Sequence, residues 1–349
     1  MIINNARFLT HKITGVQRYA IEISKKLQEL VSEIVFISPV VTQKHTDNIF
    51  KVNCIGNFQS HMWEQIDLPL YLQKEKNPLL LNLANTAPVF YKNQIITIHD
   101  LACLNEKWVS SKFKLFYEIL LPKIINNSLK VVTVSDFSKK EIVKHFKVPE
   151  NKIEVVYNAV SQEFIDLANS NYQNNYGEYI LAVSSLNPRK NFKSLIQAFN
   201  KLKLKETKLL IVGEKNNIYA NPQFNNIIQG NPDTIFTGYV TDKELVGLYK
   251  NAKLFVFPSL YEGFGIPPLE AMACGCPTIV SDVASIPEVC SDASYYVDPE
   301  DVNSIADGIY EILKNESLQT ELRNKGFERI KAFSWQNSAE KYIDIIKEF

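Results

Sequence analysis

The chain has 349 residues, and its 38 basic and 38 acidic residues give a formal net charge of zero. This length is typical of two domains rather than one. The hydrophobic fraction of 46% and the charged fraction of 22% are ordinary for a globular protein. A neutral chain of this kind lacks the overall basic charge of nucleic-acid-binding proteins, so we expect no nucleic-acid partner.

The cysteines and the N-terminus indicate a cytoplasmic protein. Five cysteines are an odd number, and their spacings match no zinc pattern, so we expect reduced thiols. The first residues lack the basic and apolar segments of a signal peptide. No segment approaches the roughly 20 apolar residues that a spanning helix needs. We therefore expect a protein that is soluble or peripheral to a membrane.

Along the first half, short apolar runs alternate with amphipathic runs, which is typical of parallel sheets covered by helices. A helix is predicted over residues 16–30. Ser138 and Glu141 predict a capping box for a helix that ends near Lys147. The predicted strands cover residues 2–9, 34–37, 79–83, 94–98, 131–134 and 153–157.

The second half repeats this alternation after a polar, asparagine-rich stretch at residues 161–175, where we place the domain boundary. Two successive doubly wound α/β units are therefore predicted, with ligands at the carboxyl ends of their strands. The predicted strands are 179–183, 208–212, 235–237, 254–257 and 278–281, and the predicted helices are 192–203, 242–251 and further helices up to residue 349.

The most informative stretch follows the predicted strand at 254–257. It contains Glu262 and Glu270, separated by seven residues that include Gly263, Phe264 and Gly265. We expect Glu262 on a loop and Glu270 in the first turn of a helix that has Pro268 at its first position and stops at Gly275. The glycines permit close approach of a ligand, and amides at a helix start bind phosphate or sugar oxygens.

Each glutamate alone also has an ordinary structural interpretation. Glu270 could accept hydrogen bonds from a ribose diol, or it could only complement the helix dipole. Glu262 could face a ligand, or it could be a solvated turn residue. Their joint position at the end of a strand favours a ligand site.

The stretch from Pro258 to Pro277, continued by Ser281-Asp282 and Ile286-Pro287-Glu288, resembles the E-x7-E motif of retaining glycosyltransferases with the GT-B fold, in particular family 4. The resemblance implies an α/β fold of two Rossmann-like, doubly wound domains that face a central cleft. It places an acceptor-side domain at residues 1–165, a nucleotide-sugar-binding domain at 166–334 and a helix that crosses back at 335–349. Donor contacts are implied for Phe264, Gly265, Ile266 and Glu270, and a catalytic role for Glu262.

The resemblance also implies the reaction. A hexose, with mannose from GDP-mannose favoured, would pass with retention from a nucleotide-sugar to a hydroxyl of a surface-polysaccharide or lipid-linked oligosaccharide precursor. No cofactor or metal is implied, because the nucleotide-sugar is a co-substrate and no Asp-x-Asp motif is placed to hold an ion.

Arg189 and Lys190 lie between a predicted strand and a predicted helix. Two cations at a helix start oppose its dipole unless an anion is present, so a donor diphosphate would suit them. A pair of solvated surface charges is the alternative. The resembling family has an Arg-Lys pair here that binds the donor diphosphate, which implies catalytic and donor-binding roles for both residues.

Four further residues are candidates for the donor site. His99 ends the strand predicted at 94–98, where it could contact a sugar or shuttle a proton, or serve only as a structural histidine. Similar enzymes have a histidine here that contacts the donor sugar, whereas Asp100 is expected to cap the next turn. Gly15 at a helix start permits phosphate approach. Tyr239 and Val240 resemble the family's base-binding turn.

Residues 106–147 carry nine lysines against four acidic residues, interleaved with aromatic and aliphatic side chains. One interpretation is peripheral docking on an anionic membrane, at the inner face of the cytoplasmic membrane, that carries a lipid-linked acceptor. The other is a solvated helix face over a normal core.

Alternative functions share the same two-domain organisation. A nucleotide-sugar epimerase or a glycosyl phosphorylase would act without a separate glycosyl acceptor, and a non-catalytic scaffold would bind nucleotide-sugars without turnover. A nicotinamide oxidoreductase is disfavoured, because no G-x-G-x-x-G follows an early strand.

Overall fold

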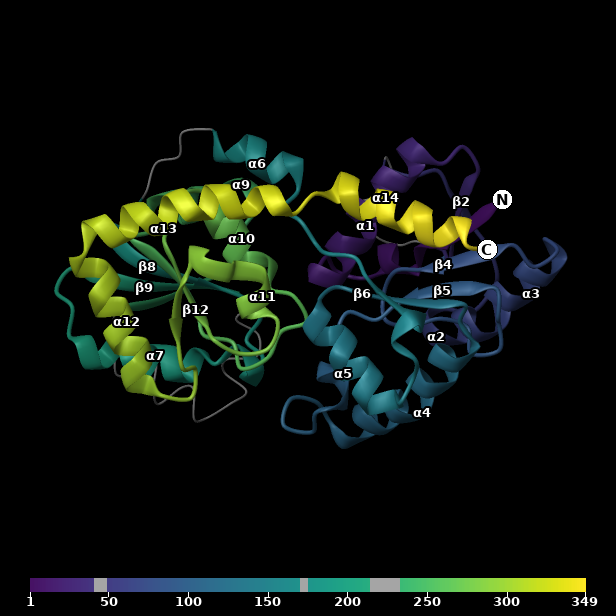
Figure 1. Cartoon of the computed structure of the whole chain (residues 1–349), viewed down its shortest axis with the longest axis horizontal. Helices are drawn as coiled ribbons and strands as arrows, with labels where there is room; N and C mark the ends of the chain where they lie inside the picture. The colour runs from purple at the N-terminus through teal and green to yellow at the C-terminus, as the bar shows by residue number, and fades with distance from the viewer. Residues whose placement is uncertain (41–48, 170–174, 214–232) are drawn as a thin grey trace. The chain divides into compact units, whose positions relative to one another are not determined.

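The computed structural model describes residues 1–40, 49–169, 175–213 and 233–349 (Figure 1). They form two compact units, the first from Met1–Asn158 with Ser334–Phe349 and the second from Ala159–Phe333. The boundary predicted after residue 165 falls inside helix α6 (Gln162–Ala168). Phe164 of α6 is buried edge-on against Tyr249 of the second unit, which explains why the whole helix belongs there.

In the described part of the first unit, seven strands form a parallel sheet with the order β3-β2-β1-β4-β5-β6-β7. The strands are β1 (Ile2–Asn5), β2 (Ile34–Ser38), β3 (Val52–Cys54), β4 (Leu79–Asn82), β5 (Gln94–Thr97), β6 (Lys130–Thr133) and β7 (Ile153–Val155). The helices are α1 (Gly15–Leu30), α2 (Ser60–Met62), α3 (Leu68–Lys74), α4 (Ser111–Asn127), α5 (Asp136–Phe146) and α14 (Trp335–Lys347), with the π-helical segment η2 (Trp63–Asp67) between α2 and α3 and the 3₁₀ turns η1 (Ala6–Thr10), η3 (Ala102–Leu104) and η4 (Glu150–Lys152).

Alternation along the strands assigns helices to the two faces of this sheet. Ile96 of β5 packs with residues of α4 and α5 in one buried cluster. Its neighbour Thr97 points the other way and lies within hydrogen-bond distance of Tyr342 in α14. Asn4 of β1 donates to Ser24 of α1, so α1 and α14 cover the same face. The C-terminal helix is thereby part of the first unit.

In the described part of the second unit, six strands form a parallel sheet with the order β10-β9-β8-β11-β12-β13. The strands are β8 (Glu178–Val183), β9 (Thr207–Val212), β10 (Thr234–Gly238), β11 (Leu254–Phe257), β12 (Thr278–Ser281) and β13 (Tyr295–Val297). The helices besides α6 are α7 (Phe192–Leu202), α9 (Asp242–Asn251), α10 (Ile266–Ala273), α11 (Ile286–Cys290), α12 (Val302–Lys314) and α13 (Glu316–Arg329), with the 3₁₀ turns η5 (Pro188–Lys190), η7 (Ser291–Ala293) and η8 (Ile330–Ala332).

Both sheets have the doubly wound order, so each has a topological switch point where the direction of strand addition reverses. In the first sheet this point lies between β1 and β4, and in the second between β8 and β11. Figure 1 shows the strands of each sheet running between covering helices. The loops that leave these strand pairs are the expected places for ligands.

Several local predictions were wrong, for identifiable reasons. The strand predicted to reach residue 9 ends at Asn5, because the Asn5 side chain accepts a hydrogen bond from the Arg7 amide and begins η1. The predicted capping box is also wrong. Ser135 is the N-cap of α5, and Ser138 instead donates to the carbonyl of His99. The short strands β3 and β13 were not predicted.

Candidate donor-binding site

The loops after β8 and β11 meet at the switch point of the second sheet. The backbone amide of Leu260 donates to the carbonyl of Arg189 at 2.8 Å and ties the two loops together. Gly265 has φ +101°, and a Cβ there would lie 2.6 Å from the Ile286 side chain. Ser285 holds the same loop through its hydroxyl, which lies 2.9 and 3.0 Å from the carbonyl oxygens of Glu262 and Phe264. The loop conformation therefore depends on a glycine and on a buried serine.

Glu262, Arg189 and Lys190 form one buried cluster at this point. Nη1 of Arg189 donates to Oε2 of Glu262 at 2.9 Å and to the carbonyl of Tyr261 at 2.9 Å. Nζ of Lys190 donates to Oε1 of Glu262. The side chains of Lys190 and Glu262 are each 8% exposed. The two cations and the carboxylate carry a net charge of +1, which suits an anionic ligand.

The cluster keeps the carboxyl of Glu262 ionised. Burial alone would raise its pKa, but the nearby charges of Lys190 and Arg189 outweigh burial and lower the pKa below its ordinary value. Glu262 therefore acts as a fixed negative partner for the two cations at neutral pH. The structure places it inside the protein, so the interpretation as a solvated turn residue is wrong.

Glu270 lies on α10, two residues further from the helix start than predicted. The helix begins at Ile266, so Pro268 is its third residue and Glu270 is beyond the first turn. Glu270 is 7% exposed, and its Oε2 accepts a hydrogen bond from the Tyr249 hydroxyl at 3.2 Å. Burial and the charge of Glu270 raise the pKa of Tyr249, which keeps this hydroxyl a donor. The helix does stop at Gly275, which has φ +69°.

The start of α10 offers few amides, because Pro267 and Pro268 have no N–H. Of the first three helical positions, only Ile266 carries one. An anion bound here would find only the Ile266 amide at the helix start, so it would depend mainly on side chains.

The predicted base-binding turn follows β10. Gly238 has φ +80°, and Tyr239 is 80% exposed. The amide of Gly213, at the end of β9, donates to the carbonyl of Gly238 at 3.2 Å. A Cβ at Gly213 would lie 2.3 Å from the carbonyl oxygen of Ser184, at the end of β8. The carboxyl ends of three neighbouring strands are thus packed backbone to backbone.

The remaining candidates, His99 and Gly15, belong to the first unit. His99 is buried, with its backbone amide donating to Asn85 and its ring edge-on to Tyr19 at 4.8 Å. Nε2 lies 3.0 Å from the carbonyl oxygen of Leu83, which can only accept, so Nε2 carries the proton and Nδ1 is the acceptor. Burial lowers the pKa of His99, so the ring is neutral at pH 7.

Two smaller predictions in this unit are also answered. The carboxylate of Asp100 accepts from the Ala102 amide at 2.9 Å, which confirms that Asp100 caps the next turn. Gly15 begins α1, and a Cβ there would meet no atom within 4 Å, so the helix start opens onto unfilled space.

The described residues show neither a metal cluster nor a membrane-spanning helix. They contain no group of three or more His, Cys, Asp or Glu side chains arranged to hold a metal ion. No helix among them combines the length and apolar composition needed to cross a membrane. All five cysteines are unpaired thiols.

Comparison with known proteins identifies the family. The model described as "Glycosyltransferase Family 4" matches residues 13–164, and that described as "Glycosyl transferases group 1" matches residues 165–329. O-antigen chain mannosyltransferase B of Escherichia coli is 32% identical over 278 residues, which cover 74% of this chain and 73% of that protein. The chain is a family 4 glycosyltransferase with the GT-B fold.

Two further comparisons cover nearly the whole glycosyltransferase. The O-antigen chain mannosyltransferase RfbU of Salmonella typhimurium is 28% identical over 321 residues, or 87% of this chain and 88% of that protein. The crystal structure of Anabaena HepE in complex with UDP and glucose superposes with a TM-score of 0.76 at 15% identity, covering 100% of this chain and 99% of that one. At this identity the superposition is a likeness of fold.

The structure brings Arg189, Lys190 and Glu262 together, while Tyr249 and Ser285 are functional candidates that sequence reasoning missed. Nothing in the local pattern around Tyr249 signals its contact with Glu270, because the two lie on different helices. The serine could have been found from its place in the segment that continues the glutamate motif.

Proposed function

We propose that this glycosyltransferase transfers mannose, with GDP-mannose as donor, to an acceptor hydroxyl in the assembly of a surface polysaccharide. Two relatives, both O-antigen chain mannosyltransferases, support the choice of sugar and process. The observation that carries the proposal is the buried cluster of Glu262, Arg189 and Lys190, whose excess positive charge lies at the switch point of the second sheet.

In the proposed reaction the bond between the anomeric carbon and the diphosphate oxygen breaks, and a bond to the acceptor oxygen forms. The acceptor proton passes to the departing diphosphate, so charge and atoms balance. Arg189 and Lys190 would stabilise the negative charge that grows on the leaving group. We propose transfer on the front face with retention, and no metal ion, since the two side chains supply the required positive charge.

Glu262 would hold the two cations in place rather than attack the sugar. Its two oxygens are each paired with one cation, so both side chains are positioned before the donor binds. A preorganised pair loses little freedom on binding, which is where such a residue contributes. Replacing Glu262 by Gln should slow transfer, and an unchanged rate would contradict this role.

We assign the other donor contacts as follows. Glu270, held by Tyr249, would accept hydrogen bonds from the ribose, and the backbone of Tyr239 and Val240 would contact the base. The loop at Phe264, Gly265 and Ile266 and the open helix start at Gly15 would lie against the donor sugar and phosphates. His99, neutral with Nδ1 as acceptor, would receive a hydrogen bond from a donor-sugar hydroxyl.

We further propose that the enzyme is cytoplasmic and docks on the anionic inner face of a membrane through residues 106–147. On α4, Leu115, Phe116 and Ile119 are 56%, 40% and 53% exposed, and Lys112 and Lys123 flank them at helical spacing. This exposed apolar stripe with basic ends favours membrane docking over a solvated face. Vesicles with and without anionic lipid provide the test.

The donor assignment is tested by a thermal-shift panel of GDP-, UDP-, dTDP- and ADP-sugars. Removing both cations would leave the buried carboxylate of Glu262 unpaired and could unfold the protein. The test variant therefore combines Arg189→Ala and Lys190→Ala with Glu262→Gln. The matched control is Lys193→Ala, which removes an exposed cation of α7.

We expect GDP-mannose to raise the melting temperature of the wild type and of the control, but not of the triple variant. Stabilisation of all three proteins alike would contradict the assignment of the donor site. Donor consumption without any glycosyl acceptor would favour the phosphorylase or epimerase alternative, and binding without turnover would favour a scaffold.

A further inference from the structure

The first unit contains a groove of about 320 Å³ on the surface of α4. This size is within the range of small-molecule pockets. Its walls come from the start of the helical segment that follows β3, from the loop after β4 and from one side of α4. The lining residues are His61, Gln65, Val89, Phe90, Phe116, Ile119, Leu120 and Lys123.

The groove is apolar in effect, because its one amide side chain is already used. Nε2 of Gln65 donates to the carbonyl of Ala87 at 2.9 Å, and its Oε1 accepts from the amide of Val89 at 2.8 Å. Gln65 thus presents only its aliphatic stem. A sugar needs several hydrogen-bonding partners, and this groove leaves only His61 and Lys123, so a sugar ring does not fit its chemistry.

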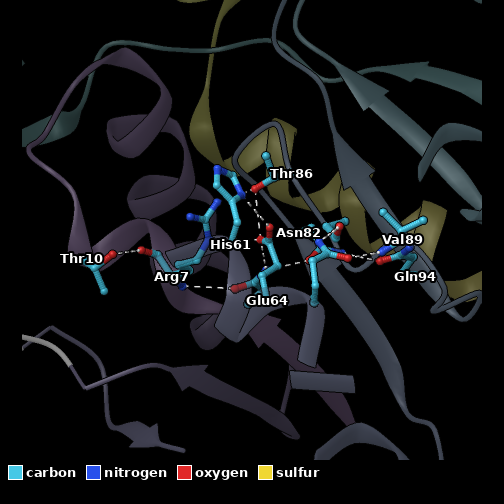
Figure 2. Close-up of polar contacts among 11 residues, drawn as sticks. Arg7, Thr10, His61, Glu64, Asn82, Thr86, Val89 and Gln94 are labelled. Carbon is cyan, nitrogen blue, oxygen red and sulfur yellow. Dashed lines mark hydrogen bonds and ion pairs between the residues drawn. The ribbon is translucent and has the colours of Figure 1, made fainter. Parts of the chain in front are cut away.

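The two polar groups of the groove are basic residues. Lys123 is exposed and forms no ion pair among the residues that the structure describes. His61 lies against Phe116, with ring centroids 5.1 Å apart, and its Nδ1 lies 3.7 Å from Oε2 of the buried Glu64. Figure 2 shows His61 directed toward Glu64 and Thr86. A hydrocarbon that ends in a phosphate would match this combination of apolar walls and basic groups.

A buried polar network holds Glu64, which lies beneath His61. Oε1 of Glu64 accepts from Asn5 at 3.0 Å. It also accepts from Arg7 Nε at 3.2 Å and from Thr86 at 3.1 Å (Figure 2). Oε2 of Glu64 lies 3.7 Å from Nδ1 of His61, beyond hydrogen-bond distance. Burial would raise the pKa of Glu64, but the neighbouring His61 side chain and the charge of Arg7 outweigh burial and lower the pKa. The wall beneath His61 is therefore preformed.

The rest of the groove exposes apolar surface, which is typical of a binding site. Phe90 is 89% exposed, Ile119 53% and Phe116 40%. An apolar groove with basic residues, in a stretch of chain with an excess of lysines, complements an anionic amphiphile. A symmetric contact of this surface with the same surface of a second copy would bring two basic stretches together and lacks that complementarity.

We infer that this groove binds the hydrocarbon chain of the glycosyl acceptor, an amphiphile whose phosphate lies beside Lys123 and His61. The identification of the amphiphile as the acceptor rests on the proposed function, whereas the groove and its ligand chemistry do not. The inference adds a binding site for the acceptor chain in the first unit, separate from the donor-binding cluster of the second unit.

The probe for this site is dodecyl phosphate below its critical micelle concentration. Isothermal titration calorimetry measures its affinity for the protein. Inorganic phosphate provides the anion without the chain, and dodecyl maltoside provides the chain without the anion. We expect dodecyl phosphate to bind tightest, dodecyl maltoside to bind more weakly, and inorganic phosphate not to bind measurably.

Substitutions on α4 and in the loop after β4 test where the hydrocarbon chain of the probe binds. Ile119→Glu places a carboxylate inside the groove and should weaken dodecyl phosphate by at least about tenfold. Leu115→Glu is the matched control, since Leu115 is equally exposed on α4 but does not line the groove. It should change the affinity by less than about twofold. Phe90→Ser, at the most exposed aromatic of the groove, should weaken both chain-bearing probes without affecting folding.

The anion is located by Lys123→Gln. This change should weaken dodecyl phosphate severalfold and leave dodecyl maltoside unchanged. Equal losses with Ile119→Glu and Leu115→Glu would overturn the inference, because probe binding would then not depend on the groove. A change in self-association, measured by analytical ultracentrifugation, without a change in probe binding would instead assign it to a second copy and would also overturn the inference.

The same variants separate this inference from the donor assignment. Ile119→Glu and Phe90→Ser should keep the full thermal shift produced by GDP-mannose, because they leave the second unit intact. Loss of probe binding with an unchanged thermal shift from GDP-mannose supports the groove as the binding site of the amphiphile. No donor shift in the wild type, with probe binding intact, would contradict the proposed function and leave the groove as an amphiphile site.

Discussion

Each sheet carries a buried glutamate paired with arginine at its switch point, yet the two arrangements differ in charge. In the first unit, Glu64 faces one permanent cation among the described residues, Arg7, and neutral donors from Asn5 and Thr86 share the same carboxylate oxygen. In the second unit, Glu262 faces two cations and the cluster keeps a net positive charge. Equivalent positions in two similar folds thus hold a balanced network and an unbalanced one.

The difference separates structure from binding. A balanced and hydrogen-bonded carboxylate contributes chiefly to rigidity, since no charge is left for a ligand to compensate. A buried cation in excess over its carboxylate partner is stabilised when an anion binds beside it. We therefore expect changes at Glu64 to act mainly on stability, and changes at Lys190 to act mainly on donor binding and turnover.

The largest expected effect is on stability, from Glu64→Ala. This change leaves Arg7 buried without its carboxylate, which costs about 3–5 kcal/mol in comparable cases. All three tryptophans, Trp63, Trp108 and Trp335, lie in the first unit, so tryptophan fluorescence during urea unfolding reports this unit alone.

The control for this measurement is Glu64→Gln, which keeps an acceptor for Asn5 and Thr86 and should cost less. Glu262→Ala should leave the tryptophan transition in place. A loss below about 1 kcal/mol for Glu64→Ala would contradict the structural role of the network.

The next effect is on turnover, from Lys190→Ala. Arg189 still pairs with Glu262 in this variant, so folding should persist while the net charge of the cluster falls to zero. We expect mannosyl transfer to slow by about 100- to 1000-fold, as when one transition-state donor is removed elsewhere. Steady-state kinetics measure the loss, and Lys193→Ala should stay within about twofold of the wild type.

A smaller effect is expected for Tyr249→Phe, which removes the hydrogen bond to Glu270. One such bond contributes about 0.5–1.5 kcal/mol, so the affinity for the donor should fall about two- to tenfold. Titration calorimetry gives the value. Tyr310→Phe, which removes an exposed hydroxyl from α12, is the control. Equal affinities for Tyr249→Phe and the wild type would mean that Glu270 does not need this contact.

The smallest expected effect appears only in acid, where protonation of the two buried glutamates lowers the stability of the fold. Both have folded-state pKa values below the ordinary value of about 4.3. The stability they contribute is fully present above that pH and is lost as the pH falls through the lowered folded-state pKa. In tryptophan-detected unfolding below about pH 4, Glu64→Gln should flatten this loss and Glu262→Gln should not. If Glu262→Gln flattened the loss and Glu64→Gln did not, the structural role assigned to Glu64 would be wrong.

The sequence predicts what is local and fails on what the fold assembles. Seven residues separate Glu262 from Glu270, and the strands are apolar runs, so both features are visible in the chain. Glu64 is not, because its partners come from positions as distant as Asn5 and Thr86 and meet only when β1 and β4 pair. Tyr249 was missed for the same reason. The first strand was predicted too long because apolar residues continue into η1.

The most direct test of the central claim is the affinity for GDP of three proteins, measured by titration calorimetry. They are the wild type, Glu64→Gln, and the triple variant Arg189→Ala, Lys190→Ala, Glu262→Gln. The account predicts equal affinities for the wild type and Glu64→Gln, and at least about tenfold weaker binding for the triple variant. Equal binding by all three, or a loss confined to Glu64→Gln, would contradict it.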